Sequence, residues 1–161
     1  MTRRYAEGTS VGVDRSMGEI RQVLRRYGAE EFSYGERLNT IGVSFIIKGI
    51  HVRISVRLPD PQDRKFTETP AKRYERPPEQ AWKAYEDEVK RLWRFLVLWI
   101  KANLEAVECG ITTLEEAFLA HMVMPDNRTV GAHLIPALHH VLTSGNMPKA
   151  LPGGTIHDPG N

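Results

Sequence analysis

The sequence lacks several features that commonly define a protein class. Cys109 is its only cysteine, and its net charge is only +2. One cysteine can form no disulfide within the chain, and it excludes a cysteine-rich zinc site. The low net charge excludes a polycation, so a site for phosphate or nucleic acid must arise from local clustering of basic residues.

Long hydrophobic runs are absent as well. The most apolar stretch is FLVLWI at residues 95–100, with Arg94 and Lys101 on either side. It is far shorter than the roughly 20 residues that a membrane-spanning helix needs. The first 13 residues contain no apolar core of the kind found in signal peptides. We therefore expect a cytoplasmic protein with no membrane partner.

Patterns typical of catalytic and cofactor sites are also missing. The chain has no Gly-x-Gly-x-x-Gly or P-loop pattern, and neither Ser33 nor Ser55 has the context of a nucleophile elbow. Histidines gather in the C-terminal third, but no two have the spacing of zinc ligands on one helix. Cys109, at an apolar helix end, is expected to be a buried, inert thiol. We expect no metal, no cofactor and no catalytic activity.

What is present favours an α+β domain over residues 1–145, with 41% hydrophobic and 26% charged residues. The longest periodic segment is residues 79–109, where apolar residues recur at steps of three and four and predict a long central helix. Pro77 and Pro78 suit its start, and Gly110 suits its end. The apolar stripe comprises Trp82, Tyr85, Val89, Leu92, Leu96, Trp99, Ile100, Leu104 and Val107.

A β-hairpin is predicted over residues 40–58. Apolar residues alternate with polar ones on both sides of Lys48-Gly49, which is typical of a tight two-residue turn. The other face of the second strand carries His51, Arg53, Ser55 and Arg57. With a short third strand over residues 31–34, this predicts a small antiparallel sheet with one face on the helices and one wet, positively charged face.

The remaining segments are assigned from caps and breakers. Their predicted ranges are an N-terminal arm (1–13), a helix from a Ser16–Glu19 capping box to Gly28, a long loop (59–78), a short helix after a Thr113–Glu116 capping box, a last helix (129–142) and a Pro/Gly-rich tail (146–161). Loops as long as 59–78 inside compact domains are usually functional or mobile.

Basic residues gather on the hairpin and in this loop. Arginine offers a planar fork that matches phosphate oxygens, and aromatic rings can stack on bases. The candidate phosphate-binding residues are Lys48, His51, Arg53, Arg57, Arg64, Lys65, Lys72 and Arg73, and the candidate stacking residues are Phe66 and Tyr74. The alternative is a solvated face that keeps the protein soluble.

The breadth of the long helix's apolar surface favours self-association. The middle of this helix is apolar all round, so it must be covered by its own domain or by a second subunit. The predicted interface of a homo-oligomer comprises Trp82, Leu92, Trp93, Leu96 and Trp99.

Four blocks together resemble a family of short, functionally unassigned proteins from tailed bacteriophages and prophages. They are TSVGVDRSMGEIRQVLRRYGAEEFSYG, VSFIIKGIHVRISVRLPDP, LEAVECGITTLEEAFLAHMVMPDNRTVG and MPKALPG, and ITTLEEAFLAHMVMPDNRTVG is the most specific part. The resemblance implies a phage protein in a bacterial host cytoplasm and supplies no catalytic residues.

These observations lead to three hypotheses for function. The first is a nucleic-acid-binding protein of the recombination or replication class, of the single-stranded DNA binding or annealing type. The second is an anti-defence protein that sequesters a host nucleotide signal or blocks a defence protein. The third is a structural or assembly component without a ligand.

Overall fold

The computed structural model describes residues 7–37, 39–71 and 73–145. Its elements are α1 (Glu7–Arg26), β1 (Ala29–Arg37), β2 (Thr40–Ile47), β3 (Ile50–Arg57), α2 (Arg64–Thr67), α3 (Pro78–Glu108), α4 (Leu114–Phe118), the 3-10 turn η1 (Leu119–His121) and α5 (Val130–Ser144). The predicted tail 146–161, residue Lys72 and residues 1–6 of the predicted arm lie outside the described residues.

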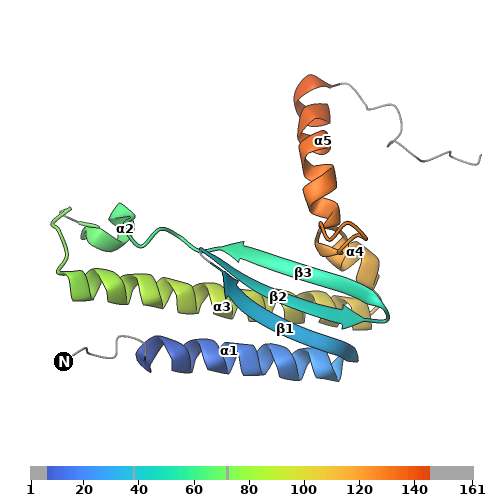
Figure 1. Ribbon diagram of the computed structural model, residues 1–161, viewed down its shortest axis with the longest axis horizontal. Coiled ribbons are helices and arrows are strands. Elements are labelled where there is room, and N and C mark those ends of the chain that lie inside the picture. Colours follow the sequence, from blue (N-terminus) through green and yellow to red (C-terminus); the bar gives the residue numbers. More distant parts are fainter. Residues whose placement is uncertain (1–6, 38, 72, 146–161) are drawn as a thin grey trace, which may run out of the picture.

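The protein is α+β, as the sequence predicts. The three strands form one antiparallel sheet in the order β1-β2-β3. Figure 1 shows α1 and α3 side by side against the sheet, while α5 extends away from the body beside the β3 edge. The core lies between one face of the sheet and these two helices, and no described element forms a layer over the opposite face.

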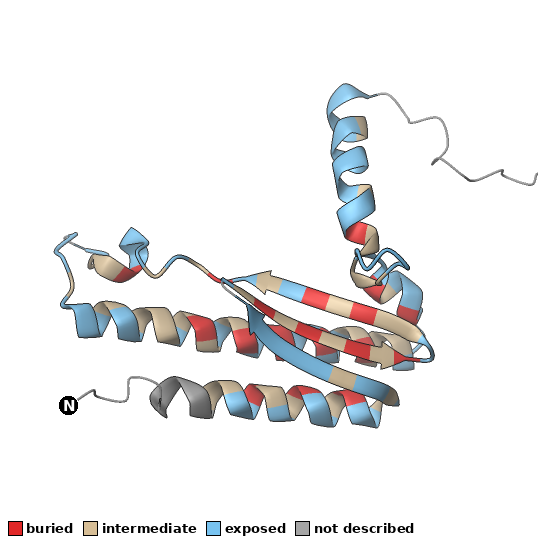
Figure 2. Ribbon diagram, in the orientation of Figure 1, coloured by how far each residue is buried: buried red, intermediate tan, exposed pale blue. Residues whose placement is uncertain are grey.

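Alternating burial explains this arrangement. Along β2 every second side chain is buried, from Ile41 to Ile47 (Figure 2). Lys48 and Gly49 both have positive φ, 51° and 73°, as the hairpin turn with the right-handed strand twist requires. The turn pairs Ile47 with Ile50, and this register puts the apolar residues of both strands on the same face. The predicted hairpin is therefore confirmed.

The long helix is confirmed at Pro78–Glu108, but its buried side differs from the predicted stripe. Trp93 is only 3% exposed and packs in the core, whereas Trp82 and Trp99 are 41% and 38% exposed. The reason is that residues 95–100 are all apolar, so periodicity alone does not fix which side of this segment faces the sheet. The buried residues are Val89, Trp93, Leu96, Val97, Ile100 and Leu104.

The same observation removes two residues, Trp93 and Leu96, from the predicted oligomer interface on α3. Trp93 and Leu96 belong to the core of the chain itself, so they cannot also meet a second subunit without unfolding. The middle of the helix is covered on one side only, and Phe95 and Leu98 remain exposed. Trp99 is partly covered, because its ring packs edge-on against Phe118 at 5.5 Å between centroids.

Two predicted boundaries in the N-terminal half are wrong, and the predicted long loop is more structured than expected. α1 begins at Glu7, so part of the predicted arm is helical and Ser16 lies inside the helix. The Ser16 hydroxyl donates to the Gly12 carbonyl one turn back, a bond that competes with the capping role. β1 runs to Arg37 instead of ending at residue 34. The loop 59–78 contains the short helix α2 and a bridge between Glu68 and Glu75.

The C-terminal third begins as predicted. The capping box is present: the Glu116 amide donates to the Thr113 hydroxyl, and the Glu116 carboxylate accepts from the Thr113 amide at 2.9 Å. Cys109, in contrast, is exposed rather than buried, because it follows the last turn of α3 beyond the core. No helix in the described part of the chain is long and apolar enough to cross a membrane.

The orientation of α3 yields a stability prediction. Replacing the fully buried Ile100 by Ala should lower the free energy of unfolding by about 2–5 kcal/mol, because it leaves a cavity against the sheet. Leu98→Ala, on the exposed side of the same helix, should change it by less than about 1 kcal/mol. Urea unfolding of both variants measures the difference, and similar losses would show that the other side of α3 faces the core.

Candidate functional site

The open face of the sheet is the surface on which the predicted hairpin residues lie. Because side chains alternate along a strand, the residues between the buried ones point to this face. The register aligns them in four rows across the three strands: Glu31, Ile46 and His51; Ser33, Ser44 and Arg53; Gly35, Gly42 and Ser55; and Arg37, Thr40 and Arg57. We call these twelve residues the open sheet face.

Small side chains form the middle of the open sheet face, and Gly35 lies directly opposite Gly42. Neither glycine has a positive φ. A Cβ built on Gly35 meets no heavy atom within 4 Å, and one on Gly42 comes no closer than 3.6 Å to the Ile54 carbonyl oxygen. The fold therefore does not require glycine at either position. Glycine weakens a strand interior, and it often marks a place where a ligand or another backbone approaches closely.

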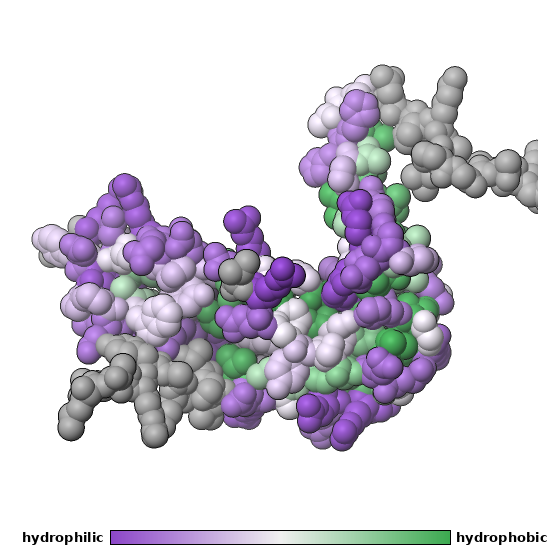
Figure 3. Space-filling view, viewed as in Figure 1, coloured by the Kyte–Doolittle hydropathy of each residue, from purple (hydrophilic) through white to green (hydrophobic). Residues whose placement is uncertain are grey.

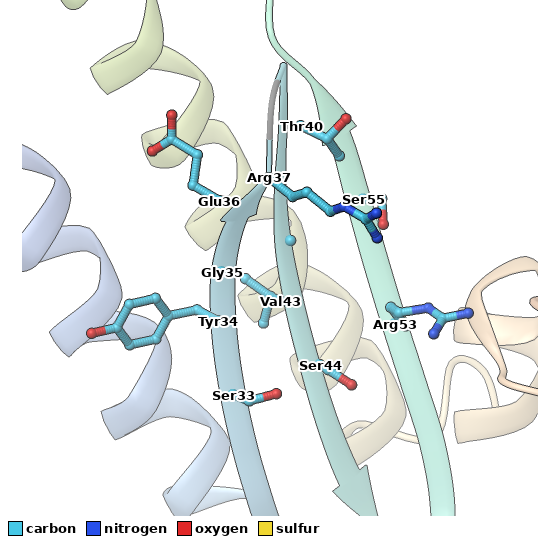
Figure 4. A pocket seen from close by; sticks show the side chains of 11 residues that line it. Ser33, Tyr34, Gly35, Glu36, Arg37, Thr40, Val43, Ser44, Arg53 and Ser55 are labelled. Atoms are coloured by element: carbon cyan, nitrogen blue, oxygen red, sulfur yellow. The ribbon is translucent and has the colours of Figure 1, made fainter. Parts of the chain in front are cut away.

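The surface around Gly35 and Gly42 forms a shallow depression, which we call the trough; the two glycines and the neighbouring serines form its floor. Figure 4 shows the trough, with Ser33 and Ser44 on its floor and Arg37 extending across β2 toward Ser55. Its volume is about 680 Å³, within the range of roughly 300–1,000 Å³ that is usual for small-molecule sites. The trough thus offers room for a ligand against a flat floor that exposes the backbone.

Three arginines of the open sheet face supply positive charge. Arg37 and Arg57 are both in register with Thr40, which separates their strands by roughly 10 Å. Arg53 and Arg57 are four residues apart on β3, or roughly 13 Å. Among the described residues, none of the three has a carboxylate within ion-pair distance. Their charge is therefore available to an anionic ligand, and Glu31 is the only acid of the twelve.

Arg53 is held in place by a neutral partner. Its guanidinium donates to the side-chain oxygen of Asn127 at 2.9 Å and also to the Asn127 carbonyl. Asn127 has a positive φ of 63° in the turn before α5, a conformation that asparagine tolerates better than most residues. An amide fixes the arginine without neutralising it, so Arg53 remains cationic beside the trough.

The hairpin end of the predicted cluster is less open. The His51 ring nitrogen Nε2 lies 2.6 Å from the Ser44 hydroxyl, so His51 is engaged with the floor. Lys48 lies in the turn at the opposite end of β3 from Arg57 and is exposed. These two residues flank the trough rather than line it.

The basic loop residues are separated from the open sheet face and largely paired. Figure 1 places α2 beyond the end of β3, over the beginning of α3. Arg64 pairs with Glu68 at 3.7 Å, and Lys65 approaches Glu88 at 3.9 Å. Arg73 is exposed and has a positive φ of 49°. The predicted cluster therefore divides in two: most of the loop part is paired, whereas the arginines on the sheet have no carboxylate partner among the described residues.

The predicted stacking role of Phe66 is wrong. Phe66 is 4% exposed because its ring packs edge-to-face on Tyr85, with 5.5 Å between centroids. It anchors the loop to α3 and cannot meet a base. Tyr74 is 66% exposed in the loop between α2 and α3 and belongs to no strand of the sheet. The twelve residues of the open sheet face include no aromatic side chain. Tyr34 and Glu36 of β1 also line the trough, but Figure 4 shows their side chains directed away from its floor.

Arg37, Gly35 and Gly42 are site residues that the sequence prediction missed. It assigned residues 35–39 to a loop, so Gly35 and Arg37 had no place on the sheet. One signal was present in the sequence, because Phe32 and Tyr34 alternate with polar residues. Because most residues of β1 are polar, this alternation was too weak to predict the full length of the strand.

A second hollow continues from the trough between the β3 edge and α5. It has a volume of about 420 Å³ and is lined by Arg53 and Ser55 on one side and by Ile135 and Pro136 of α5 on the other. His121 closes its base, with its ring 5.2 Å from the centroid of Trp99. The trough and this hollow share Arg53 and Ser55, so they form one surface depression.

Comparisons of this chain with models of known protein families, with curated proteins and with solved structures found no match. Within the described residues, no group of three or more His, Cys, Asp or Glu side chains is placed to hold a metal ion. The site is therefore interpreted from its own geometry and charge.

His121 makes the stability of this region depend on pH. Burial lowers the pKa of His121 below its ordinary value of 6.5, and a hydrogen bond to the Arg53 backbone only partly offsets this effect. Below pH 6.5 the unfolded chain then binds more protons than the folded one, so stability falls as the pH drops through this window. The loss between about pH 7.5 and 5.5 should be smaller in His121→Gln than in the unsubstituted protein. Thermal unfolding at the two pH values measures this loss of stability. The control His140→Gln, at an exposed site, should lose as much stability as the unsubstituted protein.

Proposed function

We propose that this protein binds single-stranded nucleic acid across the open sheet face. The observation that carries the proposal is the Gly35–Gly42 pair, where a Cβ would meet no close contact. It is set between arginines that have no carboxylate partner among the residues that the structure describes. A strand lying on this floor brings its sugar-phosphate backbone close to the sheet, and Arg37, Arg53 and Arg57 bind its phosphates in the bidentate manner of guanidinium groups.

The composition of the floor predicts how such binding behaves. Because the open sheet face has no aromatic ring, most of the affinity comes from phosphate contacts instead of base stacking. Binding of this kind tolerates many base sequences and falls steeply with salt. A protein that covers single strands without reading their sequence fits the recombination or replication class, and the resemblance to short bacteriophage proteins supports a phage origin.

A second candidate is favoured by the shape of the trough. Its volume of about 680 Å³, next to the hollow that α5 lines, also suits a compact phosphate-bearing ligand of nucleotide size. An anti-defence protein that sequesters a host nucleotide signal would use the same arginines. Length dependence separates the two functions, since a strand-binding protein prefers long oligonucleotides to mono- and dinucleotides.

Removing two arginines tests the electrostatic part of the proposal. Arg37→Ala combined with Arg57→Ala should weaken binding of labelled single strands of about 20–40 nucleotides at least tenfold, because two charge-assisted contacts are lost. The slope of log affinity against log salt should become shallower by about 1.4, or about 0.7 per phosphate contact. Fluorescence anisotropy over a series of salt concentrations measures both.

The matched control removes the same charge from paired sites. In Arg64→Ala combined with Arg91→Ala, the lost arginines are ion-paired to Glu68 and Glu88. This variant should retain the affinity and the salt slope. Equal losses in the two double variants would mean that net charge, rather than the open sheet face, drives binding. If the unsubstituted protein binds no single strand at low salt, the nucleic-acid proposal fails.

A bulky residue on the floor tests the steric part. In Gly35→Val the new side chain has open space, and valine suits a strand better than glycine, so stability should stay constant or rise by up to about 1 kcal/mol. Binding should nevertheless fall at least tenfold, because the side chain fills the place of closest approach. Anisotropy and thermal unfolding of the same sample check both effects; unchanged affinity would show that no ligand touches this floor.

A further inference from the structure

Among the described residues, the contacts that α5 makes with other elements lie near its beginning. A Cβ on Gly131 would lie 2.7 Å from the Ala120 carbonyl oxygen, so glycine is required where the helix meets η1. The Val130 amide donates to the Met122 carbonyl, and the Thr129 hydroxyl caps the helix by accepting from Ala132. Beyond this base, α5 continues to Ser144 away from the body (Figure 1).

This projecting helix has an apolar side that no other described residue covers, over residues 7–37, 39–71 and 73–145. Ile135, Leu138 and Leu142 recur at steps of three and four and are 51%, 54% and 73% exposed. Leu134 and Val141 lie on the same side of a 3.6-residue helix. Figure 3 shows apolar surface at the base of α5 and on its flank. An amphipathic helix normally buries such a side against a second surface.

The charge of α5 restricts what that surface can be. Residues 130–144 contain no Asp, Glu, Lys or Arg, in a chain of which 26% is charged. Binding to an anionic membrane surface would call for Lys or Arg on the polar side, and a charged partner would call for complementary charges. A second copy of the same helix requires no charged residues for binding. Two uncharged helices also bring no like charges together across a twofold axis.

We propose that α5 pairs antiparallel with α5 of a second copy, and that each tip also covers apolar side chains at the partner's base. A helix of 15 residues is only about 22 Å long, so a helix pair alone falls well short of the roughly 800 Å² per partner that stable interfaces bury. An antiparallel arrangement adds buried area at the two ends of the helix pair. It brings Leu142 toward the base of the partner, where Leu119 and Met124 are exposed.

Pairing through α5 places two nucleic-acid sites in one particle. Ile135 and Pro136 line the hollow that continues from the trough, so the helix pair stands directly beside both open sheet faces. A long single strand can then engage two faces, whereas a short one engages only one. This consequence rests on the proposed function; the pairing itself does not.

Self-association is tested without nucleic acid. Light scattering coupled to size exclusion, over about a hundredfold range of concentration, should give twice the chain mass of 18.3 kDa for the unsubstituted protein. Leu138→Glu should give a monomer, because a carboxylate would be buried in the helix pair. His140→Glu, on the polar side of the same helix, should remain a dimer. Circular dichroism shows whether both variants keep the fold, as the exposure of Leu138 predicts.

Two results would overturn the pairing. One is a monomeric unsubstituted protein at the highest concentration, and the other is a Leu138→Glu variant that is folded and still dimeric. Binding measurements distinguish a failure of the pairing proposal from a failure of the proposed function. Loss of the sheet arginines should weaken short and long strands alike, whereas Leu138→Glu should remove only the additional affinity for long strands.

Discussion

The packing of one face of the β2–β3 hairpin on α1 and α3 is the constraint on which the rest of the structure depends. Ile41, Val43 and Phe45 point into this core, so every intervening residue of β2 must point to the opposite face. A slip of one residue in register would exchange the two faces. The turn at Lys48-Gly49 prevents this, and the arginines of β3 are thereby kept together on the open side.

The same packing also determines which charged side chains lie close enough to pair. Acidic residues on the helices and in the loop pair with nearby cations, as Glu88 does with Arg91 and Glu19 does with Arg94. The arginines of the open sheet face have no such partner among the described residues, and Arg53 is fixed by the neutral Asn127. A chain with a net charge of +2 can therefore present a face that is locally positive.

Sequence patterns predicted the parts of the fold in which burial is strictly periodic. The hairpin, the bounds of α3 and the Thr113–Glu116 capping box follow from local rules. Local rules did not predict which side of α3 is buried, since residues 95–100 are all apolar. The floor of the site was missed because β1 is polar and its partner lies on β2: only the register shows that Gly35 meets Gly42.

The most direct test of the account is a map of the surface that a ligand touches. Amide chemical shifts recorded by NMR during titration with a single strand of about ten nucleotides would report this surface residue by residue. The account predicts the largest changes at Gly35, Gly42 and Ser55. Changes confined to the loop around α2, or to the helical layer of α1 and α3, would contradict it.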